Sequence, residues 1–144
     1  MPIGGGVVVS LERLERVRRF DPLLWRIEVE AGVTTARLRR LVRESGLYFP
    51  PDPGAAEQSQ VGGNIATNAG GPRCLKYGVT RDYVLGLEVV LANGTIVRLG
   101  GRTHKTKTGF DLARLLVGSE GLLGVVTEAT LKLLPLPQIG RAHV

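Results

Sequence analysis

Hydrophobic and polar residues are arranged along the chain in short patterns that predict β-strands. From Trp25 to Ala31 every second residue is apolar, and the charged residues between them face the opposite side, as in a half-buried strand. Short apolar runs predict further strands over residues 7–11, 47–49, 85–91, 95–99 and 127–134, the last preceded by an apolar run over 122–126. The pair Asn93-Gly94 between two of these runs is a strong signal for a hairpin turn.

Two stretches have the spacing and end signals of helices. Thr34 or Thr35 can cap the first helix, and Gly46 stands where a left-handed C-terminal residue belongs. The apolar face of this helix consists of Leu38, Leu41 and Val42. A second, short helix is predicted over 111–117 and is closed by Gly118. Because strands and helices intermix without a regular βαβ repeat, the sequence predicts an α+β fold.

Composition excludes several classes of protein. The 144 residues, 43% hydrophobic and 22% charged, suffice for one globular domain. The single cysteine, Cys74, excludes a disulfide framework and is expected to be a packed thiol. The two histidines, His104 and His143, are too far apart in sequence for a zinc-binding pair. No apolar run is long enough to cross a membrane and the first residues do not resemble a secretory signal, so we expect a cytoplasmic protein.

The chain is basic, with a net charge of +6 and an isoelectric point near 10.1. Between Arg13 and Arg43, however, basic residues are interleaved with acidic ones, which predicts a solvated, salt-bridged face. None of the aromatic residues alternates with basic residues, as a platform for stacking nucleic-acid bases would require. We therefore expect no nucleic-acid partner, although a small anionic ligand is compatible with the charge.

Glycine makes up 20 of the residues, and two glycine clusters are candidate ligand contacts. In VGGNIATNAGG, residues 61–71, small residues allow backbone N–H groups to approach a ligand, and a helix starting near Gly63 would direct its N-terminus at a phosphate. Short polar groups there are Asn64, Thr67 and Asn68. The alternative is a small-residue helix packed against a sheet, and the second cluster, residues 118–124, could be only a helix cap. The chain has neither the dinucleotide-binding nor the P-loop glycine motif.

Two long segments, residues 50–90 and 109–137, together resemble a known family. They resemble the FAD-linked oxidases of the vanillyl-alcohol-oxidase type, and most closely the FAD-binding subunit of glycolate oxidase and the D-lactate dehydrogenases. The resemblance runs from about Gly5 to Pro137 and implies FAD as cofactor and a PCMH-type α+β FAD-binding domain. It implies that this domain is incomplete, because the pyrophosphate loop would lie upstream of Gly4 and the cap domain would follow Pro137. No catalytic and no metal-binding residues are then expected on this chain.

The resemblance also implies which residues approach the cofactor. Those on the flavin side are Pro51, Asp52 and Pro53. Those along the cofactor path are Val61, Gly62, Gly63, Asn64, Thr67, Asn68 and Gly71. Those in the following loop and strand and in the second glycine cluster are Tyr77, Gly78, Val84, Glu120, Gly121, Gly124 and Val126. Leu122 departs from the family, which often has threonine at this position, but the turn itself is kept.

For the full enzyme, the resemblance implies oxidation of a 2-hydroxy acid such as glycolate or D-lactate by hydride transfer to FAD, with this fragment inactive alone. The expected partners are the small hydroxy acid and other subunits of a glycolate oxidase complex, which could attach peripherally to the inner face of a membrane. One alternative is a related flavin domain with another substrate, such as a lactone oxidase, or a non-catalytic FAD-binding subunit. Another is an interaction module whose glycines serve only packing.

The last seven residues, 138–144, are expected to lie outside the domain formed by residues 1–137. Their sequence, QIGRAHV, can be encoded by the read-through of a common sequencing adapter, which indicates a non-native tail. We therefore expect that removing residues 138–144 leaves the melting temperature and flavin binding unchanged. Thermal denaturation of the two forms checks this, and a clear drop in melting temperature on truncation would show that the tail belongs to the fold.

Overall fold

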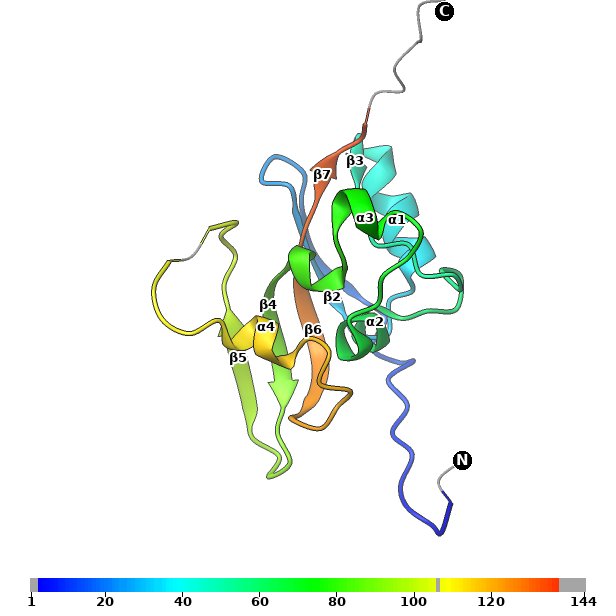
Figure 1. Ribbon diagram of the computed structural model, residues 1–144, viewed down its shortest axis with the longest axis vertical. Helices are drawn as coiled ribbons and strands as arrows, with labels where there is room; N and C mark the ends of the chain where they lie inside the picture. Colours follow the sequence, from blue (N-terminus) through cyan, green and yellow to red (C-terminus); the bar gives the residue numbers. More distant parts are fainter. Residues whose placement is uncertain (1–2, 106, 138–144) are drawn as a thin grey trace, which may run out of the picture.

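The computed structural model describes residues 3–105 and 107–137, and a five-stranded antiparallel sheet forms its centre (Figure 1). The strands follow the order β1-β2-β6-β4-β5 across the sheet. Their bounds are β1 (Val17–Asp21), β2 (Arg26–Glu30), β4 (Val84–Val90), β5 (Ile96–Gly100) and β6 (Val125–Lys132). A second, two-stranded sheet pairs β3 (Leu47–Tyr48) with β7 (Leu134–Pro135). The predicted α+β class is confirmed. The expected tail over 138–144 lies outside the described residues.

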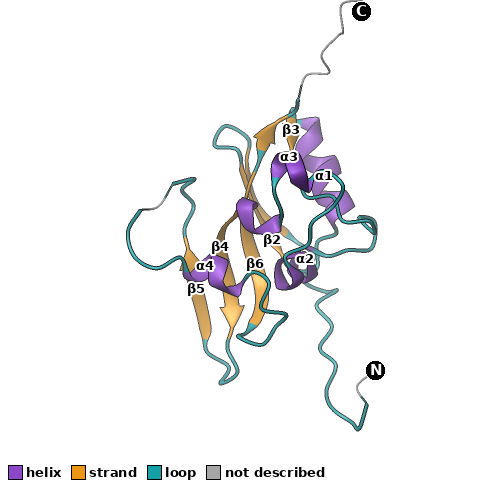
Figure 2. Ribbon diagram, viewed as in Figure 1, coloured by secondary structure: helices purple, strands orange, loops and turns teal. Residues whose placement is uncertain are grey.

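Helices cover the apolar face of the large sheet (Figure 2). Those within the described residues are α1 (Thr35–Glu44), α2 (Val61–Thr67), α3 (Cys74–Tyr77), the 3-10 helix η1 (Thr80–Tyr83) and α4 (Leu112–Leu116). Helix α2 packs against β6, and α4 packs against β4 and β5. In the sheet beneath them, Ile27 lies opposite Leu131 and Val29 lies opposite Ala129. All four side chains are buried, so this face holds the hydrophobic core.

The turn and cap residues identified from the sequence occupy the expected places. The Thr34 side chain accepts a hydrogen bond from the backbone of the first turn of α1, and Gly46 follows that helix with a φ of 72°. Gly94 turns the β4–β5 hairpin with a φ of 82°. Asp111 caps α4, and Gly118 follows it with a φ of 86°. These local signals are reliable because each meets a specific backbone requirement.

Two expectations for the first thirty residues are wrong. Residues 7–11 form no strand, and the valine side chains at 7, 8 and 9 are exposed. This stretch runs away from the sheet (Figure 1), where no described strand offers it hydrogen-bond partners. Strand β1 forms instead over 17–21, which the sequence did not indicate. Trp25 is also not part of β2, because it occupies the preceding turn with a φ of 50° and is 44% exposed.

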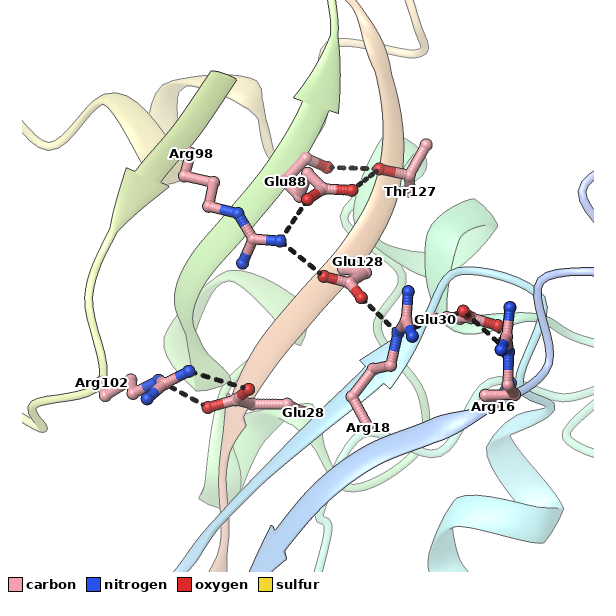
Figure 3. A network of polar contacts seen from close by, with 9 residues as sticks. All are labelled: Arg16, Arg18, Glu28, Glu30, Glu88, Arg98, Arg102, Thr127 and Glu128. Atoms are coloured by element: carbon pink, nitrogen blue, oxygen red, sulfur yellow. Dashed lines mark hydrogen bonds and ion pairs between the residues drawn. The ribbon is translucent and has the colours of Figure 1, made fainter. Parts of the chain in front are cut away.

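The other face of the sheet carries a ladder of ion pairs (Figure 3). Its carboxylates belong to Glu28, Glu30, Glu88 and Glu128, and its guanidinium groups to Arg16, Arg18, Arg98 and Arg102. Arg18 bridges two strands, with its Nε 2.6 Å from Glu128 and 3.2 Å from Glu30. The predicted salt-bridged face is confirmed in this ladder. Glu30, however, is only 1% exposed rather than facing solvent, because Arg16 and Arg18 pair with it and the Arg16 N–H donates to it.

The start of α2 lies against the end of β2 with no room for a side chain at Gly62. A Cβ atom there would lie 2.7 Å from the Cβ of Ala31, whereas at Gly63 it would meet nothing within 4 Å. We therefore expect Gly62→Ala to lower the free energy of unfolding by about 1–3 kcal/mol through overpacking. Gly63→Ala is the matched control, and we expect it to keep or slightly raise stability because alanine favours a helix.

Urea denaturation of both variants beside the parent chain measures these differences. An equal loss in the two variants, or no loss for Gly62→Ala, would contradict the packing of α2 on β2.

Candidate cofactor site

The two glycine-rich segments singled out from the sequence meet in the structure. The N–H of Gly118 donates to the Ile65 carbonyl at 2.9 Å, and the N–H of Glu120 donates to the Ala66 carbonyl at 2.8 Å. The turn that follows α4 therefore lies beside the last turn of α2 (Figure 1). We call this contact between α2 and residues 118–121 the glycine junction.

The glycines of these segments fall into two groups. Those at which a Cβ would collide with the protein are Gly62, Gly71 and Gly124, and the same holds for Gly78 in the loop between the two segments. At Gly71, for example, it would lie 2.1 Å from the backbone oxygen of Asp52. At Gly63 and Gly121 nothing lies within 4 Å of the added atom. Gly121 has a φ of 80°, which by itself favours glycine. Neither packing nor backbone conformation requires glycine at Gly63 or at Gly70, and of these two Gly63 faces open space.

The side chains of the three polar residues of the first cluster differ in their burial and in their hydrogen-bond partners. Asn64 is buried, and its side-chain amide donates to Thr35 Oγ1 at 2.7 Å, so this side chain serves the protein interior. Asn68 ends α2 in the left-handed conformation, and its Oδ1 accepts from the Arg81 N–H at 3.0 Å. Thr67 is the exposed member of the three, with its hydroxyl donating to a backbone carbonyl one turn earlier.

At the N-terminus of α2, where the sequence suggested a phosphate contact, the first two N–H groups are bonded within the protein. The helix begins at Val61 rather than near Gly63. The N–H of Val61 donates to the Val33 carbonyl at 2.9 Å, and that of Gly62 donates to Ala31 at 2.8 Å. These donors fasten the helix to the sheet, so they are not free for a phosphate.

Asp52 links the proline-rich segment to two arginines. Its carboxylate forms an ion pair with Arg39, and Arg73 Nε lies 3.6 Å from its other oxygen. Arg73 also donates to the Tyr48 hydroxyl, and this hydrogen bond raises the pKa of the Arg73 guanidinium. Sequence reasoning missed Arg39, Arg73 and Tyr48. No spacing could have revealed them, because Arg39 comes from α1, Tyr48 from β3 and Arg73 from the position before α3.

The segment after α3 is held by tyrosine and aspartate contacts. The Tyr83 hydroxyl donates to the Tyr77 carbonyl at 2.5 Å. Burial raises the pKa of the Tyr83 hydroxyl, and the negative charge of Asp82 raises it further. Asp82 caps the start of η1 and is not paired with Arg81, whose guanidinium donates to the Val117 carbonyl at 2.9 Å. Arg81 thus helps to hold the glycine junction in place.

The other residues implied by the resemblance occupy varied environments. Val61, Val84 and Val126 have side chains buried in the core, so they position the backbone of their segments. Pro51 is buried and Pro53 is half-buried, whereas Glu120 is exposed with a φ of 53°. Cys74, which we expected to be packed, is exposed.

Two further features concern the part of the chain that the structure describes, residues 3–105 and 107–137. No group of three or more histidine, cysteine or acidic side chains there could hold a metal ion. No helix among those residues is long and apolar enough to cross a bilayer. The glycine junction instead offers backbone groups, short polar side chains and a clear surface at Gly63, which suit the binding of an extended organic ligand.

Comparison with known proteins agrees with this geometry. The chain is 51% identical over 137 residues to glycolate oxidase subunit GlcD of Bacillus subtilis, covering 95% of this chain and 29% of that protein. It is 46% identical to a D-lactate dehydrogenase of Anaerostipes hadrus, covering 94% of this chain and 28% of that protein. A solved structure of alkyldihydroxyacetonephosphate synthase matches with a TM-score of 0.74 and 28% identity, over 88% of this chain and 22% of that one.

The chain thus spans less than a third of the length of these relatives. Residues 2–100, more than half of the chain, match the family described as FAD binding domain. The chain therefore belongs to the FAD binding domain family, and its cofactor is FAD.

Proposed function

We propose that this domain binds FAD for an oxidoreductase that oxidises a 2-hydroxy acid of the glycolate or D-lactate type. The observation that carries the proposal is the glycine junction, where two segments distant in sequence meet beside an exposed Gly63. The two relatives named for glycolate oxidase and D-lactate dehydrogenase support this substrate class. Their identity of 46–51% extends over almost the whole of this chain, including both glycine clusters.

The residues at the glycine junction fit FAD. A long cofactor needs a surface that side chains leave clear, and Gly63 and Gly121 provide one. We assign Gly63, Thr67 and Gly121 to direct contact with FAD through backbone and hydroxyl groups. The implied contacts of Pro51, Asp52 and Pro53 would place the flavin end near the Asp52 ion pairs. Bound FAD supplies the two-electron acceptor, while this chain binds and orients it.

A second candidate is an FAD-binding domain of a related enzyme with a different substrate. The observation that favours it is the match to alkyldihydroxyacetonephosphate synthase, whose name denotes a different activity on the same fold. Turnover of glycolate and D-lactate with a dye acceptor, measured on a full-length form, separates the two candidates.

We expect the 144-residue chain by itself to bind FAD weakly. The family resemblance places the pyrophosphate loop upstream of Gly4, and that loop would supply most contacts to the phosphates. Fluorescence titration with FAD measures binding to this chain and to a form extended upstream with the matching segment of the Bacillus subtilis relative. Equal, micromolar or tighter binding by both forms would contradict the role of the upstream loop. No binding by either form would contradict the proposed function.

In a form that retains FAD, Gly63→Val should remove the cofactor without unfolding the protein. The valine side chain would occupy the clear surface at this position, where an added Cβ meets nothing within 4 Å outside the helix itself. Gly101→Val is the matched control, because a Cβ at Gly101 also meets nothing within 4 Å and the residue lies outside both glycine clusters.

Flavin absorbance of the purified variants gives their cofactor content, and urea denaturation of the apoproteins gives their stability. We expect flavin loss only in Gly63→Val, with similar stability for both variants. If Gly63→Val kept its flavin, Gly63 would not belong to the site.

A further inference from the structure

A cleft of about 560 Å³ lies between α1, β3 and α3, and its lining is rich in arginine. Six of its lining residues define what we call the basic cleft: Arg39, Arg40, Arg43, Arg73, Tyr48 and Tyr77. The volume lies in the range of pockets that hold small organic molecules. The cleft does not include the glycines of the glycine junction, but two of its arginines pair with Asp52, which is implied to lie on the flavin side.

Two of the guanidinium groups are held in fixed positions. Asp52 pairs with both Arg39 and Arg73 and so restrains both side chains, although the Arg73 side chain remains 47% exposed. The same groups stack near Tyr48, with their Cζ atoms 6.0 and 5.8 Å from the ring centroid. Tyr77 meets the Tyr48 ring edge-on at a centroid distance of 5.7 Å. Donors that are positioned before binding lose less conformational entropy when a ligand arrives.

The positive charge of the basic cleft is not balanced. Among the described residues, Arg43 has no acidic partner. Arg40 reaches Glu57 at 3.6 Å, but both side chains are more than 70% exposed, and such a pair contributes little. Glu57 is also the single carboxylate among the residues that line the cleft. An anion that entered the cleft would therefore find guanidinium donors whose charge the protein leaves uncompensated.

We propose that the basic cleft binds a small organic carboxylate of the 2-hydroxy-acid type. The planar guanidinium fork matches a carboxylate through two parallel hydrogen bonds. The tyrosine rings offer apolar contact to a short carbon chain beside that carboxylate. The assignment rests on the proposed function for its choice of 2-hydroxy acids. It adds that this chain itself, through the arginines of the cleft, takes part in recognising the substrate anion.

Nuclear magnetic resonance titration of the FAD-free 144-residue chain tests this proposal. D-lactate is the probe, and D-lactamide is the uncharged control of the same shape. We expect D-lactate, and not D-lactamide, to cause saturable shifts in the side-chain signals of Tyr48, Tyr77 and Arg73. Sodium sulfate is the third probe, and we expect it to compete only weakly because it has no carbon chain to contact the tyrosine rings.

The variants separate the cleft from the general charge of the chain. Arg43→Ala removes an exposed guanidinium without a partner in the described residues, so folding is retained, and Arg43→Ala with Arg73→Ala removes two donors. Because each lost charge-assisted hydrogen bond weakens binding by about tenfold, we expect a loss of about tenfold in Arg43→Ala and of about a hundredfold in the double variant. The matched control is Arg37→Ala on the same helix, which does not line the cleft and should bind within about twofold of the parent.

The outcomes are distinct from those of the FAD titration, because no flavin is present here. Equal binding of D-lactate and D-lactamide, or an equal loss in Arg37→Ala and Arg43→Ala, would overturn the proposal. Sulfate binding as tight as that of D-lactate would also overturn it, since the cleft would then attract anions in general. FAD binding without D-lactate binding would reject the cleft and keep the proposed function, whereas the reverse result would keep the cleft and reject that function.

Discussion

The close contact between Gly62 and Ala31 is the constraint on which the candidate site depends. Ala31 directly follows β2, and there its N–H donates to the Thr127 carbonyl of β6 at 2.9 Å and its carbonyl accepts from Gly62 at 2.8 Å. A single residue thus connects two strands to the first turn of α2. Because this approach leaves no room for a Cβ, glycine at position 62 sets how deeply the helix lies on the sheet. The position of every residue further along α2 follows from that depth.

The C-terminal end of α2 forms one side of the glycine junction, so the depth of the helix on the sheet also sets the position of that junction. Ile65 and Ala66 lie in its last turn, and their carbonyls accept the N–H groups of Gly118 and Glu120. The two glycine clusters are therefore joined by backbone hydrogen bonds that hold their relative position whatever the neighbouring side chains are. This explains why the glycines are not equivalent. Those at which a Cβ would collide serve packing, and Gly63, which faces open space, is the one that we propose for contact with a ligand.

The sequence predicted local elements well and contacts between elements poorly, for physical reasons. Helix α1 and the β4–β5 hairpin follow from short-range periodicity and from cap and turn residues. Strand β1 was not predicted from the sequence, because the register between Val17 and Arg19 is shifted and this shift breaks the two-residue period of the side chains. The glycine junction consists of backbone bonds between distant segments and leaves no pattern in the side chains. Glycine content identified the two segments, but nothing in the sequence predicted that they would be in contact.

The distribution of charge shows why a basic chain need not bind nucleic acid. On the outer face of the sheet, each of the four carboxylates is matched by guanidinium groups, so the ladder is close to neutral (Figure 3). The excess positive charge therefore lies elsewhere, and part of it gathers in the basic cleft. A nucleic-acid backbone requires a positive stripe that follows repeated phosphates, whereas a concave group of arginines beside two tyrosines suits one small anion. Neutralising the broad face while leaving the cleft charged makes the cleft one of the places that attract a small anion.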